Sequence, residues 1–218
     1  MSHRPQLLCM TPSFDSKALA RWGLLDLVQR EERRDLLMAS VPLPAPAVLE
    51  VLRRQWRDGH EEDTDQWCAR YGTEAADFDA LVTREWRWKT FCEQRFAASL
   101  ASTFLRRKPG LDQVCFWKLT VQDEDFASEL YQRLREGEAS MQQLKAQFCG
   151  PLVLEQLPLQ LRSVLTGLHL DQVCLPLPEG NNWALLQLQQ RLPAALDEVM
   201  RSRLLLELGE TLLDSRSN

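Results

Sequence analysis

Apolar positions in the first half of the chain recur every three or four residues, the spacing of one buried helical face. A first helix is expected to begin at a cap supplied by Asp15 or Ser16 and to end at the proline-rich stretch 41–46. Its apolar positions are Leu19, Trp22, Leu25, Leu27, Val28, Leu36 and Leu37. Three more helices are expected over residues 47–57, 64–71 and 75–108. The first 108 residues are therefore predicted to form an all-helical unit.

The longest of these helices carries an aromatic-rich apolar stripe. Its members are Phe78, Leu81, Val82, Trp86, Phe91, Phe96, Leu100 and Phe104. Aromatic residues at this spacing form core in most proteins, so we interpret the stripe as core rather than as a ligand site. The basic cluster 106–108 lies at the end of the helix, where cations interact favourably with the helix dipole.

The pattern changes after Pro109. Residues 114–121 are rich in strand-forming side chains and lack a helical period, which predicts a strand. An amphipathic helix follows and ends at Gly137, with apolar positions Ala127, Leu130, Tyr131 and Leu134. Ser140 is expected to cap a second helix whose inward positions are Met141, Leu144 and Phe148.

The remaining segments predict a short helix, a hairpin and a final helix. The short helix lies within 154–165, and Pro158 must occupy its first turn or break it. Residues 173–177 and 183–188 are expected to form an antiparallel hairpin around a Pro-Glu-Gly-Asn-Asn turn. A helix beginning at Pro193 has a broad apolar face, so it should pack on the N-terminal helices.

These elements predict an α+β fold in which a helical N-terminal unit and a C-terminal helix pack around a small domain with an antiparallel sheet. The expected domains are residues 1–108, 109–192 and 193–218.

Composition excludes several classes of function. The net charge is −5 and basic residues alternate with acidic ones, which does not favour nucleic-acid binding. No run of about 18 uncharged apolar residues and no signal-peptide core occur, so we expect a cytoplasmic location without membrane insertion. The cysteines and histidines are widely spaced, so we expect reduced thiols and neither a metal nor another cofactor. They are Cys9, Cys68, Cys92, Cys115, Cys149, Cys174, His3, His60 and His169.

The order strand, helix, helix, short helix and hairpin resembles the parvulin family of peptidyl-prolyl isomerases. Residues 127–148, ASELYQRLREGEASMQQLKAQF, look like the family's first-helix signature. Residues 161–190 are similar to its closing segment of a helix, a turn, a strand with a proline and a final strand. The resemblance covers about 111–190. The helical flanks resemble SurA-type bacterial foldases, in which the helices form a chaperone cradle, although several of those proteins act outside the cytosol.

The resemblance also indicates which residues to examine. Parvulin activity is attributed to an apolar proline pocket beside a polar cluster, with histidines on the first and last strands and a cysteine or aspartate between them. Lys118 and Ala184 occupy the two histidine positions, so no catalytic residue is assigned. The loop between them is reduced to 148–151, and Cys149 aligns with a serine. Leu157 and Leu161 match two apolar pocket positions and are the candidate substrate-binding residues.

Three functions remain open at this point. The first is a chaperone or adaptor that holds polypeptide clients and has little or no isomerase activity. The second is an active isomerase that desolvates the prolyl amide and uses Lys118 or Cys149 in place of the polar cluster. The third is a structural subunit with a large exposed apolar patch and an obligate partner. The sequence does not indicate the client or the oligomeric state.

Overall fold

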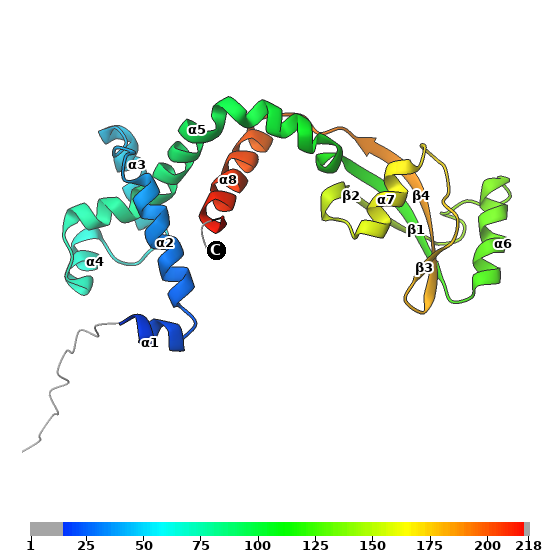
Figure 1. The fold of residues 1–218 in the computed structure, drawn as a ribbon, viewed down its shortest axis with the longest axis horizontal. Helices are drawn as coiled ribbons and strands as arrows, with labels where there is room; N and C mark the ends of the chain where they lie inside the picture. Colours follow the sequence, from blue (N-terminus) through cyan, green and yellow to red (C-terminus); the bar gives the residue numbers. More distant parts are fainter. Residues whose placement is uncertain (1–14, 216–218) are drawn as a thin grey trace, which may run out of the picture. The chain divides into compact units, whose positions relative to one another are not determined.

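The computed structural model describes residues 15–215, which divide into two compact units (Figure 1). Among the described residues, one unit contains 15–98 and 202–215, and the other is Ser99–Arg201. The predicted α+β class is confirmed. The domain ranges 1–108, 109–192 and 193–218 stay a prediction. His3 and Cys9, which were considered for metal binding, lie outside the described residues.

The first unit is helical. It contains α1 (Ser16–Arg21), α2 (Leu25–Met38), α3 (Pro46–Asp58), α4 (Thr64–Tyr71), most of α5 (Ala75–Leu111) and most of α8 (Glu198–Asp214). The prediction of one continuous helix at the start was wrong. Gly23, with φ of 70°, separates α1 from α2. The expected common face is therefore broken, and Leu36 leaves 75% of its surface exposed.

Close packing of α8 on α5 forms the core of this unit. Trp88 and Cys92 of α5 are buried, as are Leu204 and Leu205 of α8. Gly209 allows the contact, because a Cβ there would lie 2.5 Å from Cys92 Sγ. The predicted aromatic stripe is confirmed at its buried positions Phe78, Leu100 and Phe104, whereas Leu81 is exposed.

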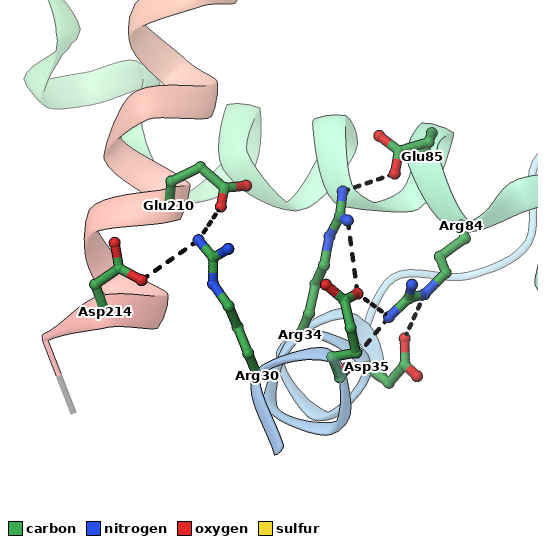
Figure 2. Close-up of polar contacts among 8 residues, drawn as sticks. Arg30, Arg34, Asp35, Arg84, Glu85, Glu210 and Asp214 are labelled. Atoms are coloured by element: carbon green, nitrogen blue, oxygen red, sulfur yellow. Dashed lines mark hydrogen bonds and ion pairs between the residues drawn. The ribbon is translucent and has the colours of Figure 1, made fainter. Parts of the chain in front are cut away.

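Ion pairs connect α2 to both α5 and α8 (Figure 2). The pairs are Arg30 with Glu210, Arg34 with Glu85 and Arg84 with Asp35. The Arg34 guanidinium also lies 4.9 Å from the centre of the Trp88 ring, a cation–π contact. Burial opposes the charge on Arg84, but hydrogen bonds with Asp35 and Glu31 outweigh it and raise the pKa of Arg84. Ion pairs therefore attach α2 to α5 and α8, the two helices that pack closely at Gly209.

The second unit contains a four-stranded antiparallel sheet in the order β2-β1-β4-β3. Its elements are β1 (Gln113–Val121), α6 (Glu124–Arg135), β2 (Gln147–Val153), a 3-10 turn (Leu154–Gln156), α7 (Leu159–Gly167), β3 (Leu177–Glu179) and β4 (Asn182–Leu192). The predicted first strand and the helix that follows it are confirmed, as are the turn and the second strand of the hairpin. Asp123 caps α6 by accepting the Phe126 N–H at 2.7 Å. Gly137, with φ of 78°, follows the end of α6 as expected.

Alternating apolar residues on the strands produce a small core on each side of the sheet. Leu185 of β4 packs with Leu130 and Leu134 of α6 on one side. Leu186 and Leu188 pack with Leu165 of α7 on the other. Because successive strand residues point to opposite faces, both neighbours Leu185 and Leu186 are buried although they belong to different cores.

The predicted second helix after Ser140 was wrong. Ser140 and Gln143 exchange backbone-to-side-chain hydrogen bonds that close a single turn, and Lys145 then adopts a positive φ of 55°. The chain next enters β2, so the segment expected to be a loop at 148–151 belongs to a strand. Phe148 is 48% exposed rather than inward. Pairing with β1 outweighs the local helical period here.

Three further segments contain prolines. Pro158 breaks the predicted helix 154–165, one of the two outcomes expected for it, and separates a 3-10 turn from α7. Pro176 has no N–H to donate to a neighbouring strand, and residues 173–176 contribute only one isolated bridge, so the strand is the short β3 that begins at Leu177. Pro193 does not start the last helix, which begins at Glu198 behind an Asp197 cap.

Pro109 has a different outcome, because α5 continues through it to Leu111. The Asp112 N–H donates to the Lys108 carbonyl at 3.1 Å and closes the last turn. Leu111 is buried and fixes the end of the helix in the second unit.

Candidate functional site

Lys118 and Ala184 lie on the same face of the sheet, on adjacent strands. Lys118 of β1 pairs with Leu186 of β4, and Thr120 pairs with Ala184. Directly paired residues of antiparallel strands point to the same face, and diagonal neighbours are roughly 7–8 Å apart. The two residues are therefore diagonal neighbours on the face covered by α7.

A pocket of about 250 Å³ opens on this face, between the start of α7 and the β3–β4 hairpin. Its lining residues are Pro158, Gln160, Leu161, Leu177, Pro178, Glu179, Gly180 and Ala184. Ala184 is only 1% exposed, so its methyl group adds apolar surface without filling the pocket. The lining is mainly apolar and suits a small apolar group of a ligand.

The two candidate leucines occupy different environments. Leu161 of α7 lines the pocket. Leu157 precedes α7 and packs, partly buried, against the core cluster that contains Phe116 and Leu165. The structure thus brings Leu161 and Ala184 together and places Leu157 outside the lining, and the assignment of Leu157 to substrate binding stays a prediction.

An ion pair crosses the sheet beside the pocket. Lys118 Nζ lies 2.5 Å from Glu179 Oε1, although β4 separates the strands that carry them. Lys118 is paired with Leu186 and Glu179 with Asn182, so the side chains meet above the stretch of β4 that contains Ala184. A small residue at 184 leaves room for this crossing, and a histidine side chain would occupy the same space.

Cys149 is not an activated nucleophile. It lies on β2 opposite Phe116, on the same face as Lys118. Burial raises the pKa of the Cys149 thiol, and the nearby Lys118 ammonium offsets only part of this effect. The thiol is therefore protonated at neutral pH, and only the thiolate reacts as a nucleophile.

We expect Cys149 to react with iodoacetamide more slowly at pH 7 than a cysteine in an unstructured peptide, with a rate that is still rising at about pH 9, the unperturbed thiol value, instead of having levelled off. Lys118→Met should slow the reaction further, because it removes the cation that lowers the pKa. Rates measured by mass spectrometry at several pH values test this. A plateau reached below pH 8 would show an activated thiol.

Within residues 15–215, no group of three histidine, cysteine or acidic side chains is arranged to hold a metal ion. The helices in the same range include none of sufficient length and apolarity to span a bilayer. The cytoplasmic location stays a prediction.

Sequence reasoning missed the half of the pocket that the hairpin supplies. Leu177, Pro178, Glu179 and Gly180 are recognisable in sequence as strand end and turn. Their position opposite Leu161 depends on the pairing of β3 with β4 and on the place of α7 over the sheet. The spacing of residues along the sequence predicts neither the strand pairing nor the position of α7.

Comparison with known proteins supports a fold assignment. No protein-family model and no curated protein sequence matches the chain. Among solved structures, the peptidylprolyl isomerase PrsA from Bacillus cereus matches over 91% of this chain and 79% of that chain, with 11% identity and a TM-score of 0.51. The chain has a PrsA-like fold.

Two further structures are similar at lower TM-scores. PrsA from Bacillus anthracis is 14% identical over 87% of this chain and 94% of that chain, with a TM-score of 0.45. One of two SurA-like chaperones from Campylobacter jejuni is 13% identical over 94% of this chain and 85% of that chain, with a TM-score of 0.34. The PrsA-like fold confirms, at the level of architecture, the resemblance to peptidyl-prolyl isomerases that the sequence indicated.

Proposed function

We propose that this chain is a foldase-like chaperone that binds extended or proline-containing segments of polypeptide clients and has little or no isomerase activity. One observation carries the proposal. The apolar pocket at Leu161 is present, while the two positions where the family has histidines hold an ion-paired Lys118 and a methyl group at Ala184.

The chemistry of isomerisation explains why binding and catalysis separate here. Rotation about an X-Pro bond has a barrier of roughly 18–20 kcal/mol, so a catalyst must bind the twisted amide better than the planar one. Lys118 is engaged by Glu179, Ala184 offers no polar atom and Cys149 is a neutral thiol. The pocket can bury a prolyl ring, but these positions provide no polar cluster to favour the twisted state.

Exposed apolar surface on the helical unit supports a chaperone role further. A hollow of about 180 Å³ between α2 and α8 is lined by Leu36, Leu37, Leu212, Leu213 and Arg33. Leu36, one of these lining residues, is largely exposed. Apolar surface of this kind is available to unfolded client segments, consistent with the cradle role that the sequence resemblance implies.

We expect Leu161→Ala to weaken the binding of proline-containing peptides by roughly tenfold, equivalent to the loss of about 1.4 kcal/mol of apolar contact. Leu159→Ala is the matched control, because Leu159 lies on the same helix and is 72% exposed outside the pocket lining. NMR titrations of isotope-labelled protein give both affinities. Equal losses for the two variants would place the binding site elsewhere.

The active isomerase remains the alternative. It would be favoured by accelerated X-Pro exchange that is lost in Lys118→Ala, since that variant removes the single charged side chain at a family histidine position. Binding without acceleration supports the chaperone.

A further inference from the structure

We propose that the pocket selects polypeptide segments in which an apolar side chain has a lysine or arginine within two residues, with Glu179 as the residue that determines this preference. The proposal rests on the proposed function, because it specifies the client chemistry of the same pocket.

The charge of the pocket comes from one residue. Among the described residues that line it, Glu179 alone is charged. The same cavity is bounded by the apolar side chains of Leu161, Leu177 and Ala184. A bound segment that inserts an apolar group between these side chains must therefore pass close to a carboxylate.

The two members of the ion pair differ in accessibility. The Lys118 side chain is 23% exposed and the Glu179 side chain 42% exposed. Glu179 Oε1 accepts a hydrogen bond from the Lys118 ammonium, whereas Glu179 Oε2 has no hydrogen-bond partner within residues 15–215. A carboxylate can accept several donors at once. A client cation can thus bind Glu179 while Lys118 stays in place.

An acidic group of a client has no comparable binding partner in the pocket. It would have to reach the Lys118 ammonium, which is mostly covered and already paired with Glu179. Binding there requires the existing ion pair to break, which offsets the gain. The net charge of −5 on the whole chain also favours the approach of basic segments over acidic ones.

The size of the pocket limits how far apart the apolar residue and the basic residue of a client can be. An extended chain advances about 3.3 Å per residue, and alternate side chains point to the same side. The apolar walls and Glu179 line a single pocket, so an apolar group and a cation no more than two residues apart can reach both.

Three blocked peptides that differ at one position test the inference: Gly-Xaa-Leu-Pro-Gly with lysine, glutamine or glutamate at Xaa. Their dissociation constants are measured by NMR titration of the full-length protein at low and high salt. We expect the lysine peptide to bind about threefold to fivefold more tightly than the glutamine peptide, and the glutamate peptide to bind most weakly. The difference should shrink in about 1 M salt.

Variants assign the effect to Glu179. Glu179→Gln should abolish the preference for lysine, whereas Glu138→Gln, which makes the same charge change in the exposed turn after α6, should retain it. Lys118→Met should increase the preference, because Glu179 is then no longer neutralised. Equal affinities for the three peptides in the wild-type protein would overturn this inference alone. No shift with any of them would overturn the proposed function as well.

Discussion

Gly150→Ala is expected to destabilise the sheet unit by more than about 3 kcal/mol, because steric overlap and backbone strain act together. A Cβ at this position would lie 2.5 Å from the Val114 carbonyl oxygen and 2.9 Å from Cys115 Cα. Both are backbone atoms of β1, which pairs with β2 and β4 on its two sides and cannot move away alone. The φ of 118° adds strain for any residue with a side chain.

Hydrogen exchange measured by mass spectrometry provides the test, because it follows each unit separately. Protection of β1 and β4 amides should fall sharply in Gly150→Ala, while the helical unit keeps its protection. Gly137→Ala is the control, since Gly137 also has a positive φ but a Cβ there would meet nothing within 4 Å. Similar losses in the two variants would show that the contact with β1 is unimportant.

Gly209→Ala is expected to destabilise the helical unit by about 2 kcal/mol, although alanine normally favours a helix by about 1 kcal/mol over glycine. The added Cβ would lie 2.5 Å from Cys92 Sγ and 2.8 Å from Trp88 Cζ2. The tryptophan ring is rigid and 1% exposed, so α8 must move away from α5. Burial raises the pKa of Cys92 to about 11, so the opposing group is a neutral thiol held by packing.

Thermal unfolding of wild type, Gly209→Ala, Cys92→Ala and the double variant forms a cycle that isolates this contact. We expect Cys92→Ala to recover part of the loss caused by Gly209→Ala, because it removes the nearer of the two clashing atoms. Stabilisation by Gly209→Ala, or strict additivity of the two changes, would contradict the packing described here.

Local sequence patterns correctly predicted those elements in which the local conformational preference matches the tertiary packing. The period of Ala127, Leu130 and Leu134 gave α6, and all three are buried. The turn residues around Gly180 gave the β3–β4 hairpin. In these segments the local preference and the tertiary packing agree, which is why the period alone was sufficient.

The pattern failed where pairing with a distant strand outweighed local preference. The apolar residues of 141–148 have helical spacing, yet Phe148 lies on β2 opposite Trp117 of β1. The two rings pack edge to face, with their centres 5.0 Å apart. The candidate site shows the same limit. Alignment with the family identified Leu161 and Ala184, which line one pocket. The ion pair between Lys118 on β1 and Glu179 on β3 depends instead on how both strands pair with β4, which no local sequence pattern encodes.

The central claim is that the pocket binds proline-containing segments without accelerating their isomerisation. The most direct test follows cis–trans exchange of X-Pro peptides by NMR with and without the protein, against an uncatalysed time of about 10–100 s. The account predicts peptide shifts that depend on Leu161 and an exchange rate equal to the background. Acceleration that disappears in Lys118→Ala would contradict it and would make this protein an isomerase that works without the family histidines.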